Sequence, residues 1–283
     1  EDYPEKFLKG CEIAKIPTKE IEISEVLKKE KELNKNILRA FHVPDALIHP
    51  PKLFDLVAKE IRAYGGKILT NHQVISIKQT NNSISSIVVS HNGVKNNIEC
   101  DGIINAAGPW SDKVAKLINQ NVELQLTRGC GIFFTGQLVS QAINRCRIPN
   151  NNDIMCPSGK ESLWGTTSEV VNNPDTSKTS PDEIQELLLG AEELFPNIKN
   201  YKSFRTWSGV RPLAKPKNIN NTLPLPRSHL VIDHEGMGLK NFLTVCGGAL
   251  TTHRLMAEDV VNNLGNKFGI DIACSSHTTP LLN

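Results

Sequence analysis

Residues 241–254, NFLTVCGGALTTHR, pass from an apolar segment through two glycines into a threonine-rich segment. Residues 242–246 predict a buried strand, because a short apolar run bounded by glycine is typical of one. Gly247 and Gly248 permit a tight turn and a close approach of the main chain to a ligand. We therefore expect a strand and a turn that faces a ligand, although a purely structural turn has the same pattern.

A helix is predicted directly after this turn. Thr251 or Thr252 is its expected N-cap, and Gly265 its expected end. Its apolar positions follow helical spacing and are Leu255, Met256, Val260 and Leu264. The unpaired N–H groups and positive dipole end of such a helix suit an electron-rich ring edge or a phosphate.

Two other segments point to the same kind of site. Residues 100–110, CDGIINAAGPW, contain a short predicted strand at residues 102–104 that ends in small residues. Open α/β sheets place ligands at the carboxyl ends of strands, although small residues also serve tight packing. In residues 207–213, WSGVRPL, Arg211 lies between a valine and a proline on a constrained backbone. Arg211 is either directed at a ligand or part of a surface ion pair.

In their order along the chain, six segments resemble the FAD-dependent glycerol-3-phosphate dehydrogenases, within the glutathione-reductase-like FAD oxidoreductases. They are VPDALIHPPKL at residues 43–53, INAAGPW at 104–110, INRCRIP at 143–149, WGTTSEV at 164–170, SGVRPL at 208–213 and GGALTTHRLMAE at 247–258. The INRCR and RLMAE blocks are similar to the anaerobic, multi-subunit type. The resemblance implies that FAD is reduced by the substrate and reoxidised by a quinone or an electron-accepting partner subunit.

The resemblance also implies the architecture. The expected class is α/β, with a glutathione-reductase-like FAD-binding domain at residues 42–121 and 206–270. An antiparallel-sheet substrate cap is expected at residues 1–41 and 122–205, and a tail or linker at 271–283. The family begins with a G-x-G-x-x-G unit that binds the FAD pyrophosphate, and these residues contain none. We therefore expect an FAD-binding domain that is incomplete at its N-terminus, in a chain that is part of a longer protein.

Periodicity predicts the remaining elements of the FAD-binding domain. A helix is expected after Pro51, with Gly65 and Gly66 at its end. A short strand is expected at residues 67–70. A hairpin should follow, with its apolar residues at Val74, Ile75 and Ile77 on one arm and Ile84, Ile87, Val88 and Val89 on the other.

In the expected cap, residues 131–134 and 162–165 are predicted strands of an antiparallel sheet. Ser180 and Glu183 predict a capping box, with Pro181 at the first position of a helix. The apolar face of this helix comprises Ile184, Leu187, Leu188, Ala191 and Leu194. The charged residues 19–37 are either an amphipathic helix or a solvated surface, and we favour the solvated surface.

The resemblance implies the site residues. Arg211 and Arg227 match the two family arginines nearest the phosphate and the substrate, and Thr251 matches a hydroxyl near the flavin. Arginine suits a phosphate because its planar donors bind phosphate oxygens in pairs. The expected cofactor-binding residues are Val74, Ala106, Ala107, Gly108, Gly247, Gly248, Ala249 and Leu250. His253, one turn into the helix, is a candidate general base or an ordinary polar side chain.

The sequence departs from the family at three positions. Where the family reads GGKLTTYR, this chain has Ala249 and His253 in place of the lysine and the tyrosine. Gly131 replaces the histidine of the aerobic TKGSH segment. The lost lysine should weaken stabilisation of developing negative charge. The departures leave open an amino-acid or 2-hydroxy-acid oxidase or dehydrogenase, and a non-catalytic subunit that retains the fold.

Composition narrows the class of protein. The chain has 283 residues, 39% of them hydrophobic, and a formal net charge of +2. The near balance of charge predicts no nucleic-acid partner. No run approaches the roughly 18 apolar residues of a membrane span, so we expect a cytoplasmic protein whose membrane contact, if any, is peripheral to the inner face. Its seven cysteines form no C-x-x-C pair, which predicts reduced thiols and no metal site.

Overall fold

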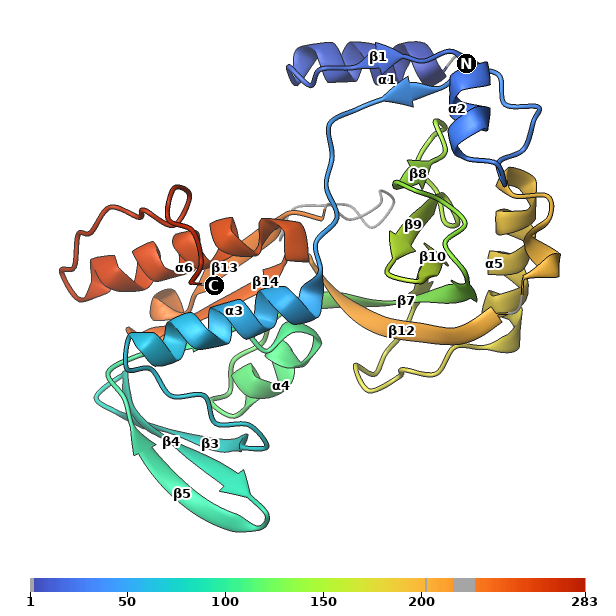
Figure 1. Ribbon diagram of the computed structural model, residues 1–283. Helices are drawn as coiled ribbons and strands as arrows, with labels where there is room; N and C mark the ends of the chain where they lie inside the picture. The colour runs from blue at the N-terminus through green and yellow to red at the C-terminus, as the bar shows by residue number, and fades with distance from the viewer. Residues whose placement is uncertain (1–2, 202, 216–226, 283) are drawn as a thin grey trace. The chain divides into compact units, whose positions relative to one another are not determined.

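The computed structural model describes residues 3–201, 203–215 and 227–282 (Figure 1). The chain forms two compact units. Unit 1 comprises Glu1–Leu47 and Thr127–Val210, and unit 2 comprises Ile48–Leu126 and Arg211–Asn283. The predicted boundaries were residues 41/42, 121/122 and 205/206, and residues 271–282 belong to unit 2. The assignment of unit 1 as cap and unit 2 as FAD-binding domain stays a prediction.

Unit 1 is built on an antiparallel sheet. Its strands are β7 (Leu124–Thr135), β8 (Ile143–Asn144), β9 (Ile154–Ser158), β10 (Glu161–Gly165), β11 (Glu169–Val170) and β12 (Ser203–Ala214). The order is β11-β7-β10-β9-β8, and β12 also pairs with β7. The two predicted strand segments lie inside β7 and β10, so that prediction is confirmed, although β7 is much longer than predicted.

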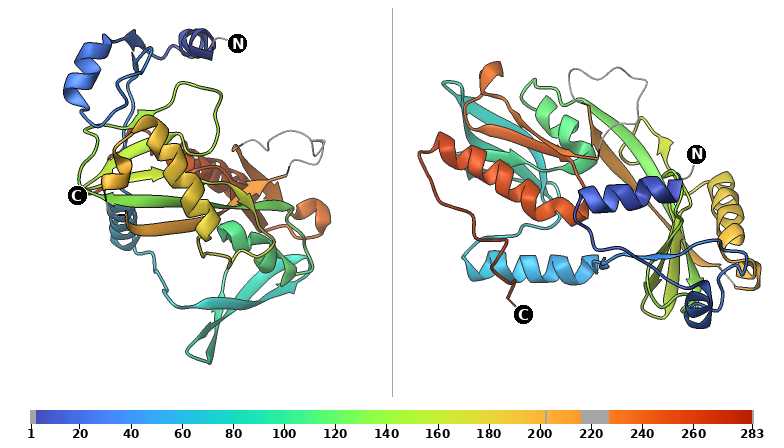
Figure 2. Two further views of the ribbon diagram at one scale, coloured as in Figure 1. Left: turned by 90° about the vertical axis from the view of Figure 1, so that its right-hand side faces the viewer. Right: turned by 90° about the horizontal axis from the view of Figure 1, so that it is seen from above.

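Helix α5 (Pro181–Leu194) covers one face of this sheet (Figure 2, left). Ser180 and Glu183 form the predicted capping box, and Pro181 begins the helix. Leu187 and Ala191 are fully buried and lie in one core cluster with Trp164 of β10. The 3₁₀ turn η2 (Ile198–Asn200) follows the helix.

A buried ionic network joins α5 to the sheet. The Nη2 of Arg128 on β7 donates to Glu183 Oε2 at 2.7 Å, and also to Glu169. Glu183 Oε1 accepts hydrogen bonds from Thr167 Oγ1 at 2.9 Å and from the thiol of Cys130 at 3.1 Å. The side chains of Arg128 and Glu183 are each 8% exposed. The helix cap therefore also neutralises a buried arginine.

The first residues of unit 1 form α1 (Tyr3–Ile13), β1 (Lys19–Glu20), α2 (Ile23–Lys29) and β2 (Phe41–His42), with β1 antiparallel to β2. The preference for a solvated surface at residues 19–37 is wrong for part of this segment. Val26 and Leu27 of α2 pack against the core of unit 1, and Leu33 is buried. These apolar residues have a core to pack against, which the local charge pattern did not indicate.

Unit 2 contains a small mixed sheet of β6 (Ile103–Asn105), β13 (His229–Asp233) and β14 (Phe242–Gly247), in the order β13-β14-β6. Strand β14 is parallel to β6 and antiparallel to β13. The strands predicted at residues 242–246 and 102–104 are thus confirmed within one residue. In the chain, η1 (Gly108–Trp110) and α4 (Ser111–Lys116) follow β6, and η3 (Glu235–Met237) lies between β13 and β14.

Helix α6 (His253–Lys267) packs on β14 through Val260, which shares a core cluster with Leu243 and Val245 (Figure 1). The predicted end at Gly265 is wrong, because the helix continues to Lys267. The left-handed residue that ends it is Gly269, with φ +69°. The N–H of Ile270 bonds to the carbonyl of Gly265 at 2.9 Å, which closes the turn.

The other elements of unit 2 are α3 (Pro50–Ala63) and a sheet of β3 (Gln73–Thr80), β4 (Ser83–His91) and β5 (Val94–Glu99). The helix and the hairpin are confirmed, but β5 was not predicted. The predicted strand at residues 67–70 is wrong: this segment is irregular, and Ile68 and Leu69 are exposed. No strand of the described residues pairs with it to supply backbone partners.

Candidate functional site at the carboxyl ends of β6 and β14

Two predicted segments meet at one edge of the small sheet in unit 2. In the parallel pair, Leu243 lies opposite Ile104, and Thr244 lies opposite Asn105. Both strands therefore end on the same side, and each is followed by small residues. We call this the glycine edge; it consists of Ala106, Ala107, Gly108, Gly247 and Gly248. Strand ends of this kind are where open α/β sheets bind ligands.

Gly247 ends β14 and Gly248 follows it, and both have left-handed backbones, with φ +76° at Gly247 and +69° at Gly248. A Cβ at Gly247 would lie 2.6 Å from the carbonyl oxygen of Ser228. A Cβ at Gly248 would lie 2.4 Å from the sulfur of Met256. Side chains are thus excluded by the surrounding protein as well as by the backbone, which keeps the turn tight against α6.

Gly108 has a different environment. Its φ is +54°, and a Cβ there would meet nothing within 4 Å. Ala106 is exposed. The backbone after β6 is therefore open to a ligand, while the backbone after β14 is packed from behind.

The start of α6 completes the edge. Ala249, Thr251 and His253 are exposed, and η4 (Leu250–Thr252) precedes the helix. Thr252 occupies the N-cap position, but its side chain makes no forward capping bond. Its hydroxyl instead bonds back to Ala249, accepting from the N–H at 3.1 Å and donating to the carbonyl at 3.0 Å. The predicted N-cap position at Thr252 is therefore confirmed, but its side chain does not cap the first amides of α6.

The structure places the two predicted arginines on segments that lead to this edge. Arg211 is half-buried on β12, and Ala214 of the same strand lies 3.3 Å from the Cβ that Gly247 lacks. Arg227 is exposed and precedes β13, whose first residue, His229, is paired with Gly247. Residues 216–226 lie outside the described part of the chain.

Two further predicted site residues make contacts within the protein. Val74 on β3 belongs to a core cluster with Phe242 and Ile103, where β14 and β6 begin. His253 directs its Nδ1 to the carbonyl oxygen of Leu250 at 2.7 Å. Val74 therefore lies near the beginnings of these strands, whereas His253 lies at the start of α6, next to the glycine edge.

Gly131, which the resemblance aligns with the histidine of the aerobic TKGSH segment, lies on β7 of unit 1. A Cβ there would be 2.5 Å from Nε1 of Trp207 and 3.0 Å from the carbonyl oxygen of Trp164. Any side chain at position 131 therefore requires Trp207 to move. Glycine at position 131 is therefore part of the packing of β7 against β12.

The sequence did not point to a histidine–carboxylate pair behind the glycine edge. Nε2 of His229 lies 2.6 Å from Oδ2 of Asp259 on α6, with side-chain exposures of 16% and 44%. The pair ties the start of β13 to α6. His229 adjoins the turn, because it is paired with Gly247 and its Cβ lies 3.2 Å from the Cβ that Gly248 lacks.

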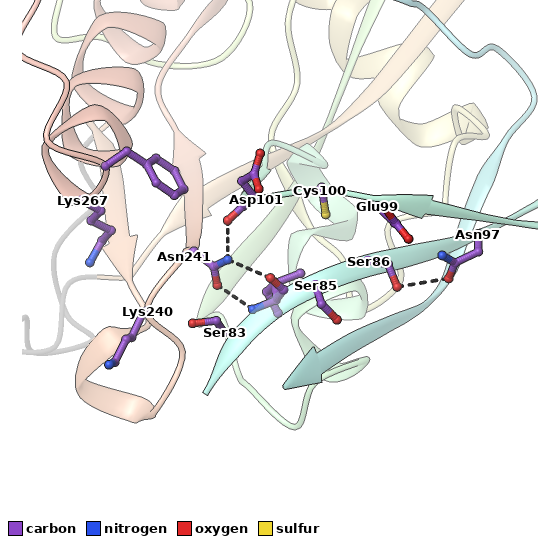
Figure 3. Close-up of a pocket in the computed structure, with 12 residues that line it drawn as sticks. Ser83, Ser85, Ser86, Asn97, Glu99, Cys100, Asp101, Lys240, Asn241 and Lys267 are labelled. Carbon is purple, nitrogen blue, oxygen red and sulfur yellow. Dashed lines mark hydrogen bonds between the residues drawn. The ribbon is translucent and has the colours of Figure 1, made fainter. Parts of the chain in front are cut away.

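The opposite ends of β6 and β14 border a polar groove (Figure 3). Its lining residues include Ser83, Ser85, Asp101, Asn241 and Lys267. Lys267 is paired with Asp233 at 2.7 Å and Glu235 at 2.6 Å. Burial lowers and these carboxylates raise the pKa of Lys267, with a net increase. None of the predicted site residues lines this groove.

Neither a membrane span nor a metal cluster is found within residues 3–201, 203–215 and 227–282. No helix there has both the length and the apolar character to cross a bilayer. No group of three or more His, Cys, Asp or Glu side chains in the same residues could hold a metal ion.

A family model described as FAD dependent oxidoreductase matches residues 4–262. The chain therefore belongs to the FAD-dependent oxidoreductase family, and FAD is its cofactor.

Among curated proteins, the chain is similar to the A1-subunit of the anaerobic glycerol-3-phosphate dehydrogenase of Haloferax volcanii. The two are 28% identical over 295 residues, which cover 99% of this chain and 50% of that protein. The A-subunit of the Escherichia coli K12 enzyme is 29% identical over 275 residues, covering 95% of this chain and 51% of that protein. The chain thus spans about half the length of these relatives.

Two solved structures show the same fold. Glycerol-3-phosphate dehydrogenase from Bacillus halodurans, in complex with FAD, matches with a TM-score of 0.76 and 18% identity, covering 92% of this chain and 54% of that one. Glycine oxidase from Bacillus cereus matches with a TM-score of 0.74 and 19% identity, covering 94% of this chain and 70% of that one. At 18% and 19% sequence identity, these two matches show a shared fold and nothing more about this chain.

The glycine edge fits a flavin on its own geometry. Gly108 faces open space, Ala106 and Ala249 are small and exposed, and the first amides of α6 follow the turn. Flat ligands need such close access to the backbone at the end of a strand. FAD supplies the two-electron redox chemistry when bound, and the protein supplies position and field.

Proposed function

We propose that the protein oxidises sn-glycerol 3-phosphate to dihydroxyacetone phosphate and passes the two electrons to a quinone or to a partner subunit. The observation that carries this proposal is the meeting of two small-residue turns at the glycine edge, with the segments of Arg211 and Arg227 leading to it. The similarity to subunits of glycerol-3-phosphate dehydrogenase supports the choice of substrate.

Arg211 and Arg227 are proposed to bind the phosphate of the substrate. A phosphate dianion needs planar, paired N–H donors, which guanidinium groups provide. Arg211 is half-buried, so its contact with a phosphate would be partly shielded from water. Arg227 is exposed and would close the site from the β13 side.

The backbone of the glycine edge and Thr251 are proposed to hold the flavin and the substrate carbon beside each other. Oxidation of the secondary alcohol removes two electrons and two protons and converts C–O–H to C=O. Thr251 is exposed just before α6, where its hydroxyl can bond to a ligand. His253 is exposed at the first residue of α6 and is retained as a candidate proton acceptor.

The proposal includes a partner. The two similar curated proteins are described as subunits of an anaerobic dehydrogenase. A separate electron-accepting subunit, or a quinone, is therefore proposed as the oxidant of the reduced cofactor. We place the protein in the cytoplasm or at the inner face of the cell membrane.

The test is anaerobic reduction of the flavin in the full-length protein by glycerol 3-phosphate. Arg211→Ala and Arg227→Ala should each raise KM and lower kcat/KM. The lost transition-state stabilisation should be about 2 kcal/mol or more, because a charge-assisted contact is lost. Arg62→Ala, an exposed arginine on α3, is the matched control and should change neither value. Normal kinetics in both site variants would exclude the proposed phosphate site.

A second candidate function follows from Ala249, which is exposed at the position of the family lysine. A site without that cation suits an amino acid or a 2-hydroxy acid, whose carboxylate would use Arg211. Ala249→Lys separates the two candidates. It should speed flavin reduction by glycerol 3-phosphate if that is the substrate, because an ammonium group stabilises developing negative charge. A slower or unchanged rate would favour the carboxylate substrate.

A further inference from the structure

Four buried polar residues form a neutral network directly behind the loop of the glycine edge. Three contribute side chains, namely Asn105 at the end of β6, Thr244 on β14 and His234 after β13, and Ser111 at the start of α4 contributes its carbonyl. The exposed fractions are 3% for Asn105 and 0% for Thr244, His234 and Ser111. Burying uncharged polar groups is unfavourable unless they are hydrogen-bonded, so each bond of this network matters.

Asn105 bridges the two sides of the loop that follows β6. Its Oδ1 accepts from the N–H of Ala107 at 3.3 Å, and its Nδ2 donates to the carbonyl oxygen of Ser111 at 2.9 Å. An N–H must meet the oxygen and a carbonyl must meet the nitrogen, so these two partners determine the orientation of the amide. The loop between them contains Gly108, whose φ is +54°.

Thr244 and His234 extend the network. Asn105 Nδ2 also donates to Thr244 Oγ1 at 3.2 Å. Thr244 Oγ1 and Nε2 of His234 lie 3.0 Å apart, and the tautomer of His234 decides which of the two donates. Burial lowers the pKa of His234, outweighing the nearby Asp233, and so favours a neutral imidazole.

We propose that Asn105 is a positioning residue for the FAD site, and that Thr244 and neutral His234 hold its amide in place. We call the side chains of Asn105, Thr244 and His234 the clip. The clip orders the backbone of Ala106, Ala107 and Gly108 without placing a charge beside them. This proposal rests on the proposed location of FAD at the glycine edge. The network lies behind the loop, so it acts on the ligand through the backbone.

The same strands provide a matched control at their other ends. Asn241 is 7% exposed; its Oδ1 accepts from Ile84 N–H at 2.6 Å, and its Nδ2 donates to the Ile84 carbonyl at 2.9 Å and to that of Asp101 (Figure 3). It joins β4 to the start of β6. Asn105 and Asn241 are thus similarly buried and each makes three hydrogen bonds, but only Asn105 contacts the loop of the glycine edge.

The experiment compares Asn105→Ala with Asn241→Ala in the full-length protein. The measurements are the dissociation constant of FAD, amide hydrogen exchange in residues 106–110 and the melting temperature. Both substitutions should lower the melting temperature. Only Asn105→Ala should raise the dissociation constant, by about tenfold or more, and speed exchange at Ala107.

A second pair of variants tests the proposal even if Asn105→Ala fails to fold. Thr244→Ser keeps the hydroxyl and should bind FAD like the wild type, whereas Thr244→Val removes it and should follow Asn105→Ala. Equal loss of FAD affinity in the Asn105 and Asn241 variants, or unchanged affinity in Asn105→Ala and Thr244→Val, would overturn the proposal. A wild-type protein that binds FAD but does not oxidise glycerol 3-phosphate would refute the proposed substrate and leave the positioning role standing.

Discussion

The two units bury polar side chains in different ways. In unit 1, Arg128 and Glu183 form a charged pair that joins a strand to a helix. In unit 2, Asn105, Thr244 and His234 form a chain of neutral hydrogen bonds behind a loop. A buried charge needs its counter-charge, whereas a neutral network needs only correctly directed donors and acceptors. The charged pair holds a helix against a sheet in the core of unit 1. The neutral network orders a loop in unit 2 without adding a fixed charge near it.

The largest expected effect concerns the ionic network. Glu183→Ala should lower the free energy of unfolding by about 3–5 kcal/mol, because it leaves Arg128 buried beside only the exposed Glu169. Glu192→Ala is the control on the same helix, where the half-buried Glu192 is paired with the exposed Lys199, and it should cost about 0–1 kcal/mol. Urea denaturation measures both. Similar losses in the two variants would mean that the buried pair has no special role.

A smaller loss is expected from the neutral network. His234→Leu removes the hydrogen-bond partner of the Thr244 hydroxyl and should lower the free energy of unfolding by about 1–3 kcal/mol. His277→Leu, at an exposed position, should change it by no more than about 0.5 kcal/mol. A loss in His234→Leu that equals the loss in Glu183→Ala would remove the energetic distinction between the two networks.

The smallest effect is a difference in pH dependence. Burial tends to raise the pKa of Glu183, but Ser180, Cys130, Thr167 and Arg128 together hold it below its usual value. The stability from Glu183 is therefore complete above the unfolded pKa of about 4.3 and is lost as the pH falls through the lower folded pKa.

His234 gives a window at higher pH. Burial lowers the pKa of its imidazole, so the unfolded chain binds a proton more readily than the folded one. Stability should fall as the pH drops below the unfolded pKa of about 6.5, towards the lower folded pKa. Melting temperatures measured from about pH 4 to 8 should lose the upper step in His234→Leu and the lower step in Glu183→Ala. Steps that persist in both variants would assign the pH dependence to other groups.

Local patterns predicted the elements that their own residues stabilise. The capping box at Ser180 and Glu183 and the strand at β14 were confirmed. Strand β5 was missed, although the Asn92–Gly93 turn before it has the positive φ angles of a hairpin signal. The segment at residues 67–70 was predicted as a strand from its apolar residues alone, but a strand also needs a neighbour, and none of the described residues provides one.

The candidate site likewise contains residues that local sequence predicted and residues whose partners are distant in the chain. The sequence pointed to Gly108, Gly247 and Gly248, since a turn that needs a left-handed backbone selects glycine locally. It did not point to Asn105 as a clip, nor to the pairing of His229 with Asp259, because an asparagine or a histidine has no pattern that reveals a distant partner. The site residues that the resemblance implied stay predictions.

The sequence by itself indicated the strands β6 and β14, the glycine turns that follow them and the capped helix α5, and it determined the family to which the chain belongs. Only the tertiary structure decided which polar groups are buried together. Asn105 and Thr244 are 139 residues apart in the chain, and Arg128 and Glu183 are 55 apart. Propensity and capping depend on neighbours within a few residues. A hydrogen bond between distant residues depends on strand register and packing, which exist only once the chain has folded.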